Sequence, residues 1–246
     1  MERYLVLRLE APLIAFGGEA IDNYGVIRPF PAKSMMTGML ANALGLERQE
    51  GKTLQALQDN LIMGSRIDSQ ERLLRDFQTV ELSKSDQGWT TRGRVEGRAG
   101  GAGSYAAPHL RYRDYWTDAN TTVVLRTHSA APFTLDQVES ALLEPARPIF
   151  IGRKSCIPSA FILNGDVSAK SVFHALMALW DNRIREPARL QWPASEGPLE
   201  DDVLLRELGH FRVEPICDER NWITGVHAGE RMVHVLDVDP GDWGNA

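Results

Sequence analysis

Hydrophobic and polar residues alternate at several places along the chain, and each alternation predicts a β-strand. The first spans residues 4–9 and would place Leu5, Leu7 and Leu9 on one face of a sheet. Comparable stretches predict strands at residues 61–67, 76–82, 123–127 and 161–167. Two later stretches, 203–213 and 231–238, predict a final hairpin.

Apolar residues three or four apart predict helices between these strands. One begins at Ser34, which we expect to be its N-cap, and ends at Gly45. Further helices are expected from residue 53, over 134–143 with Thr134 as N-cap, and over 168–180 with Ser168 as N-cap. The segment 181–205 is rich in Pro, Glu and Asp and is expected to form loops.

The resulting order, β-α-β-β-α and then a further strand, is that of a ferredoxin-like or RNA-recognition (RRM-like) fold. We therefore expect an α+β protein whose main domain spans residues 1–167. A long insert at about residues 82–120 interrupts this domain. Residues 168–246 would add a helix and a small β extension packed on the same body.

Charge is spread unevenly over a chain whose net charge is −6. Residues 196–246 carry twelve acidic and four basic side chains, whereas residues 92–113 carry five arginines and one glutamate. A net acidic protein argues against general nucleic-acid binding, but phosphates respond to charge within a Debye length. The basic insert is therefore a local candidate for nucleic-acid contact, and its alternative is a surface loop without a binding role.

Two short segments, residues 28–45 and 148–156, place basic side chains and a serine beside Gly or Pro. Lys33 and Ser34 would sit at a helix N-terminus, where unpaired backbone N–H groups attract phosphate. The turn Gly152, Arg153, Lys154, Ser155 would present donors and backbone amides to a second anion. We expect Lys33, Arg153 and Lys154 to be exposed, and two such sites favour a polyanion.

The stretch that follows the insert interleaves arginines with aromatic rings: Arg111, Tyr112, Arg113, Tyr115 and Trp116. Arginines that bind phosphates, together with rings that stack on bases, are typical of single-strand RNA contacts. The alternative for Arg111 and Arg113 is surface salt bridging to neighbours such as Asp114, which contributes little stability.

Other chemistry is not indicated by the sequence. The two cysteines and six histidines lack the spacing of zinc ligands, and nucleotide-binding and nucleophile-elbow motifs are absent. No metal, cofactor or catalytic residue is expected. Two cysteines without a disulfide pattern, and no signal peptide or apolar run of membrane-spanning length, favour the cytoplasm.

Several segments, in order and spacing, resemble the CasD-type subunit of type I-E CRISPR Cascade complexes, which belongs to the RAMP superfamily. They are LRLEAPLIAFGG, RPFPAKSMMTGMLANALG, DFQTV, YRDYWTDANTTVVL and IFIGRKSC. The resemblance runs from the N-terminus to about Leu163 and is weak beyond it. It implies a ferredoxin-like body with a protruding β-hairpin, the thumb, which falls on the basic insert.

The resemblance also implies a function in antiviral defence. Such a subunit binds the 5′ handle of the CRISPR RNA without cutting it and caps one end of the backbone filament. Its partners would be CasC-type backbone subunits and a CasA-type large subunit, and contact of the thumb with target DNA stays open. The expected RNA-binding residues are Arg28, Lys33, Ser34, Arg92, Arg94, Arg98, Arg111, Tyr112, Arg113, Gly152, Arg153, Lys154 and Ser155.

The alternative is a CRISPR endoribonuclease that processes precursor RNA. The related subunit of type I-C systems uses a constellation of Tyr, Lys and His for this reaction. Here His109, beside the basic insert, would have to act as general base with a tyrosine, and no lysine adjoins it.

Overall fold

The computed structural model describes residues 1–18, 23–69, 72–81, 88–89, 95–96, 108–179, 187–198, 211–227 and 229–238. Its strands are β1 (Glu2–Ile14), β2 (Tyr24–Gly25), β3 (Leu61–Ser69), β4 (Arg72–Val80), β5 (Gly88–Trp89), β6 (Val95–Glu96), β7 (His109–Thr127), β8 (Leu163–Ala169), β9 (Ala188–Pro193), β10 (Arg212–Ile216) and β11 (Arg231–Val238). Its helices are α1 (Lys33–Ala43), α2 (Gly51–Asp59), α3 (Leu135–Leu143) and α4 (Val172–Ala178). The expected α+β class is confirmed, and every described helix is too short or too polar to cross a membrane.

The main sheet has the strand order β10-β11-β9-β3-β7-β1-β8, and all neighbours along this path are antiparallel. Its central part, β3-β7-β1-β8, contains the four strands that the sequence arranges as β-α-β-β-α-β. The C-terminal strands β9, β10 and β11 extend the sheet beyond β3. Of the final hairpin predicted from the sequence, the strand at 231–238 is confirmed as β11. Its partner β10 begins only at Arg212, and most of the predicted strand at 203–213 lies outside the described residues.

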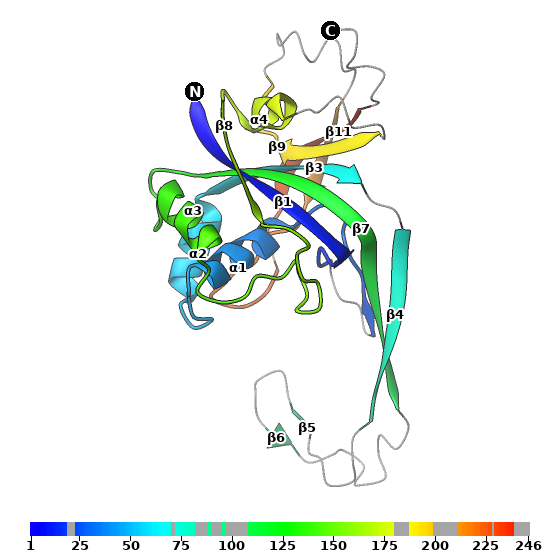
Figure 1. The fold of residues 1–246 in the computed structure, drawn as a ribbon. Helices are drawn as coiled ribbons and strands as arrows, with labels where there is room; N and C mark the ends of the chain where they lie inside the picture. Colours follow the sequence, from blue (N-terminus) through cyan, green and yellow to red (C-terminus); the bar gives the residue numbers. More distant parts are fainter. Residues whose placement is uncertain are drawn as a thin grey trace.

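Alternation in β1 divides the core between the two faces of the sheet. Leu5, Leu7 and Leu9 are buried in a cluster with α1, α2 and α3, as the sequence predicts. Tyr4 and Val6 are buried in a second cluster with α4, β9 and β11. The sheet is therefore covered on both faces, with α1, α2 and α3 on one face and α4 on the other (Figure 1).

A long hairpin formed by β4 and the first half of β7 projects from this body (Figure 1). The pairing runs from Arg72 opposite Thr117 to Val80 opposite His109, whereas the second half of β7 lies between β1 and β3 in the sheet. The sequence predicted only residues 123–127 of β7. Most of the insert between β4 and β7, with Arg92, Arg94 and Arg98, lies outside the described residues.

Three local expectations are wrong. The N-cap of α1 is Ala32 rather than Ser34, and that of α4 is Ser171 rather than Ser168, because β8 continues to Ala169. The segment expected to be loop contains β9, whose alternating side chains at Ala188, Leu190 and Trp192 are buried. By contrast, Thr134 caps α3 as predicted and forms a capping box with Gln137.

Candidate nucleic-acid interface

The turn that follows residue 151 is held tightly against the end of β1. Gly152 has a φ of +87°, and a Cβ there would lie 1.8 Å from the carbonyl oxygen of Ala15. The Ala15 N–H donates to the oxygen of Ile151 at 3.3 Å. A glycine is therefore required at this close approach. Lys154 and Ser155, at the outer side of the turn, are exposed as expected.

Arg153 points inward from the same turn, contrary to the expectation that it is exposed. Its Nη1 donates to the carbonyl oxygen of Asp114 and its Nη2 to that of Gly25, both at 2.8 Å. The guanidinium also lies 4.7 Å from the centre of the Tyr115 ring. Arg153 thus joins the turn to β2 and β7, and its side chain is only partly exposed.

Arg113 meets Arg153 at Gly25. A Cβ on Gly25 would lie 3.1 Å from the Nη1 of Arg113 and 3.1 Å from the Nη2 of Arg153. Because Gly25 has no side chain, both guanidinium groups have room beside its backbone. Within this cluster the Arg113 Nη1 donates to the oxygen of Tyr112 at 3.0 Å. Two basic residues far apart in the sequence are thus brought together, as an anion site requires.

Tyr112 and Arg111 lie on opposite faces of the hairpin, because side chains alternate along β7. The Tyr112 ring stacks on Tyr24, with centroids 4.9 Å apart and planes at 12°. One face of Tyr112 is therefore covered by the protein. Arg111 is on the same face as Arg113, and its Nη1 donates to the oxygen of Leu110 at 3.3 Å.

Asp114 anchors the base of the hairpin. Arg75 donates to its two carboxylate oxygens at 2.7 and 2.9 Å, and Asp114 is only 4% exposed. The hydrogen bonds from Arg75 hold the pKa of this carboxyl below its usual range. Of the neighbours considered as salt-bridge partners of Arg111 and Arg113, Asp114 is thus already paired with Arg75.

The start of α1 is occupied by the C-terminal segment. The N–H of Lys33 donates to Asp218 Oδ2 at 2.9 Å, and the N–H of Ser34 donates to the main-chain oxygen of Asp218 at 3.0 Å. Lys33 Nζ pairs with Glu219 at 2.8 Å, so its side chain is largely buried rather than exposed. Two of the backbone donors expected to be unpaired at this helix start, those of Lys33 and Ser34, are thus already used by the protein itself.

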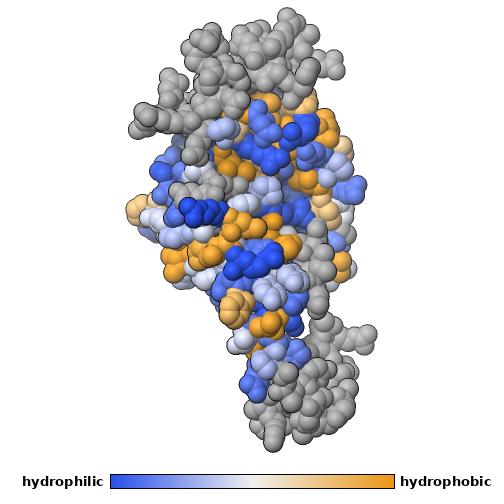
Figure 2. Space-filling view, turned by 90° about the vertical axis from the view of Figure 1, so that its right-hand side faces the viewer, coloured by the Kyte–Doolittle hydropathy of each residue, from blue (hydrophilic) through white to orange (hydrophobic). Residues whose placement is uncertain are grey.

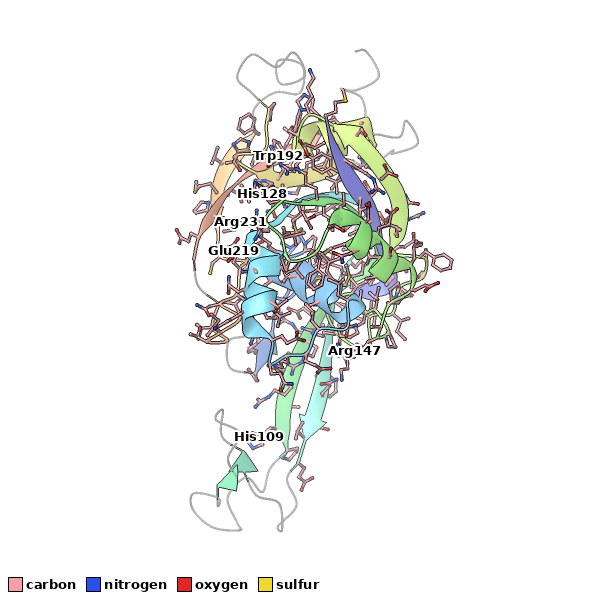
Figure 3. The ribbon with its side chains drawn as sticks, turned by 90° about the vertical axis from the view of Figure 1, so that its left-hand side faces the viewer. His109, His128, Arg147, Trp192, Glu219 and Arg231 are labelled. Atoms are coloured by element: carbon pink, nitrogen blue, oxygen red, sulfur yellow. The ribbon has the colours of Figure 1, made fainter. Side chains whose placement is uncertain are left out.

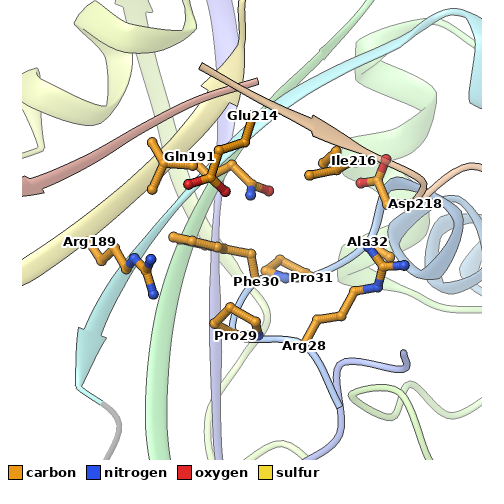
Figure 4. A pocket seen from close by; sticks show the side chains of 11 residues that line it. Arg28, Pro29, Phe30, Pro31, Ala32, Arg189, Gln191, Glu214, Ile216 and Asp218 are labelled. Carbon is orange, nitrogen blue, oxygen red and sulfur yellow. The ribbon is translucent and has the colours of Figure 1, made fainter. Parts of the chain in front are cut away.

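Arg28 lies in a different place from the other candidates. Its Nη2 donates to the oxygen of Cys217 at 2.7 Å. Together with Phe30, Arg189 and Glu214, it lines a cavity of about 160 Å³ (Figure 4). Basic and acidic side chains are mixed in this cavity, so it has no clear preference for an anion.

One groove unites the two segments singled out by the sequence. Its volume is about 260 Å³, and its walls include Ser34 and Met35 from α1 and Gly152 and Arg153 from the turn. A neighbouring hollow shares Ser34, Met35 and Gly152 and continues along α1. The groove therefore connects the helix start to the basic turn, which gives an extended anion room for more than one contact.

Sequence reasoning missed the other wall of this groove, formed by Arg220, Trp222 and His227. They belong to residues 196–246, whose excess of acidic side chains gave no indication of an anion site. The signal was present as the pair of Arg220 and Trp222 two positions apart, an Arg beside an aromatic ring. Its position opposite the turn depends on tertiary packing.

His109 and Cys156, the other side chains considered for catalysis, do not line this groove. Figure 3 shows His109 toward the outer end of the hairpin, away from Glu219 and Arg231 in the body. Burial raises the pKa of the Cys156 thiol, which disfavours the nucleophilic thiolate. Within the described residues, no three His, Cys, Asp or Glu side chains are grouped as metal ligands.

Comparison with known proteins assigns the family. The family described as CRISPR-associated protein (Cas_Cas5) matches residues 4–234. The chain is 30% identical over 165 residues to the CRISPR system Cascade subunit CasD of Escherichia coli (strain K12), a match that covers 63% of this chain and 67% of that protein. The resemblance to CasD-type subunits is thereby confirmed.

Two solved structures share the fold. One is described as a CRISPR RNA-guided surveillance complex, with a TM-score of 0.63, 20% identity, and coverage of 96% of this chain and 90% of that chain. The other is described as the crystal structure of a Cas protein, with a TM-score of 0.60, 24% identity, and coverage of 97% and 96%. Since the family match extends from β1 into β11, the chain belongs to the CRISPR-associated Cas5 family.

Proposed function

We propose that this chain is a non-catalytic RNA-binding subunit of a CRISPR surveillance complex of the Cascade type. It binds the 5′ handle of the CRISPR RNA and caps one end of the backbone filament. The observation that carries the proposal is the groove in which Ser34 from α1 meets Gly152 and Arg153 from the turn. Membership of the Cas5 family makes RNA the expected polyanion.

The charged groups around the groove are suited to phosphates. Arg153 and Arg113 converge at Gly25, and the exposed Lys154 adds a charge beside them. Arg111 continues this basic surface along one face of the hairpin. A single strand could follow these positions from the groove toward the hairpin, with one phosphate at each basic group.

Lys33, Ser34 and Arg28 take different roles in this proposal. Asp218 accepts from the N–H groups of Lys33 and Ser34, and Glu219 pairs with the Lys33 side chain, so no phosphate contact is assigned to Lys33. Ser34 lines the groove, although only 7% of the residue is exposed. Arg28 contacts the C-terminal segment instead of facing the groove. Phosphate contacts are therefore assigned chiefly to the turn and to β7.

The projecting hairpin, or thumb, is proposed to contact a neighbouring subunit of the CasC type. Its surface carries apolar side chains that a monomer leaves exposed: Leu73 at 52%, Phe77 at 63%, Val80 at 50% and Leu110 at 41%. Figure 2 shows hydrophobic positions among hydrophilic ones along this projection. Exposed apolar side chains on a projecting element favour a protein partner. A CasA-type subunit and target DNA are further proposed contacts of the assembled complex.

Co-purification tests this proposal with a matched pair of variants. Tagged chain, expressed with its CRISPR locus, should retain a small RNA and several partner proteins. Lys154→Ala should reduce the RNA retained, whereas Lys170→Ala, an exposed lysine at the opposite end of β1, should not. If the unmodified chain retained partner proteins but no RNA, RNA binding would be contradicted. If Lys154→Ala and Lys170→Ala retained equal amounts of RNA, the turn would not be part of the interface.

A further inference from the structure

The wall of the groove opposite the turn is a short loop that α2 holds rigidly. Gln58, on α2, is 1% exposed and fixes this loop by three hydrogen bonds. Its Nε2 donates to the oxygen of Arg220 at 2.9 Å, and its Oε1 accepts from the Arg220 N–H at 3.2 Å and the Trp222 Nε1 at 2.9 Å. The backbone that carries Arg220 is therefore held in place before any ligand arrives.

The side chain of Arg220, unlike those of Arg153 and Arg231, has no polar partner within the described part of the chain. Its Nε is buried and has no hydrogen bond, and its guanidinium makes no ion pair within the described part of the chain. By contrast, Arg231 donates to both oxygens of Asp218, and Arg75 donates to both oxygens of Asp114. A buried charged donor left unpaired is costly, so this position favours an anion.

The neighbours of Arg220 orient its guanidinium and leave space for a ligand. The guanidinium lies 5.4 Å from the centre of the Trp222 ring, an arrangement that holds the planar fork by a cation–π contact. Gly17 and Gly18 line the same groove and have no side chains to fill it. Arg153 lines it as well. A backbone that carries negative charge can thus enter between two arginines.

We propose that Arg220 binds a phosphate of the RNA backbone in this groove and that Trp222 and Gln58 position it. The proposal rests on the proposed function, since it assumes that RNA occupies the groove. It assigns to the C-terminal segment a direct part in RNA binding. The chemistry is a bidentate contact between the guanidinium and a phosphodiester, for which the arginine fork is well suited. Asp218 and Arg231 fasten the same segment to α1 and take no part in the contact.

Binding of the full chain to repeat RNA, measured at several salt concentrations, tests this contact. Arg220→Ala should weaken binding about tenfold, as for loss of one charged hydrogen-bonded pair. The slope of log affinity against log salt should fall by about 0.7, the value for one phosphate of a single strand. Arg220→Gln should act in the same way. Arg212→Ala is the control, because it removes the same charge from an exposed ion pair on β10 and should change affinity less than twofold.

A second set of RNAs, each with one uncharged methylphosphonate, locates the partner phosphate. At one position the substitution should weaken binding to the unmodified chain but should not weaken binding to Arg220→Ala further, which is the coupling expected of a contacting pair. Unchanged melting temperatures would show that the variants are folded. Additive losses at every position, or equal affinities of Arg220→Ala and Arg212→Ala, would overturn the proposal. If Lys154→Ala still weakens binding, the proposed function stands without this contact. If the unmodified chain binds no RNA, both fail.

Discussion

The carboxylate of Asp218 accepts a hydrogen bond from the backbone N–H of Lys33 at 2.9 Å, so a residue from the C-terminal segment completes the first turn of α1. Arg231 donates to both oxygens of this carboxylate at 2.7 and 2.8 Å. A negative charge at a helix N-terminus is favoured by the helix dipole. Asp218 therefore joins the segment that carries Arg220 to the start of α1, and both line the groove.

Asp218→Asn should destabilise the protein by about 3 kcal/mol, because it leaves Arg231 largely buried without its charge partner. Denaturation by urea measures this loss. Glu214→Gln is the control, since Glu214 and Arg212 form an exposed pair and the change should cost less than about 1 kcal/mol. Equal losses in the two variants would show that the contact between Asp218 and Arg231 does not stabilise the fold.

The pair of Arg75 and Asp114 predicts a stability difference that depends on pH. The pKa of Asp114 is lowered in the folded state, chiefly by hydrogen bonds from Arg75, so the contribution of the pair is present above the unfolded pKa of about 3.9. It is lost as pH falls through the lower, folded value. Arg75→Gln should therefore be less stable than the unmodified chain at pH 7. The difference should shrink below about pH 4, and a difference independent of pH would contradict this origin.

Gly152→Ala should displace the turn and weaken RNA binding together with stability. Its φ of +87° disfavours a side chain, and the added Cβ would overlap the oxygen of Ala15. Gly165→Ala measures the effect of a positive φ alone, because Gly165 has a φ of +92° and nothing lies within 4 Å of its Cβ position. The control should cost about 1 kcal/mol and leave RNA binding intact. Equal losses of stability in both variants would argue against the close approach at Ala15.

Arg153 and Lys154 should separate stability from binding. Arg153→Ala removes two hydrogen bonds to main-chain oxygens and should cost about 2 kcal/mol. Lys154→Ala, at an exposed position, should change stability by less than about 0.5 kcal/mol. Both should weaken the binding of repeat RNA. Urea denaturation and RNA titration of each variant test this, and wild-type affinity of Lys154→Ala would exclude Lys154 from the contact.

Local patterns in the sequence predicted the elements whose stability is itself local. The alternation at Leu5, Leu7 and Leu9 and the N-cap at Thr134 depend on near neighbours, and the structure contains both. The start of α1 was assigned wrongly to Ser34, because the residue that satisfies its donors, Asp218, is 185 positions away from Lys33. No local pattern contains that contact.

In the candidate site, too, the sequence predicted the residues of a local motif and missed those placed by tertiary packing. Gly152 and Arg153 were identified from a turn motif, and the groove contains them. Arg220 and Trp222 were missed, since only the packing of their loop on Gln58 places them opposite the turn. The strand β9 was missed because the Pro- and acid-rich residues around it obscured an alternation of six residues.

Incubation of the purified full chain with precursor repeat RNA tests the central claim most directly, because one gel reports both binding and cleavage. The account predicts that the RNA is bound, that its affinity falls as salt rises, and that it remains intact. His109→Ala, which changes a residue at the outer end of the hairpin that does not line the groove, should give the same result. RNA cut at a defined position by the unmodified chain, with cleavage lost in His109→Ala, would contradict the account and establish the endoribonuclease instead.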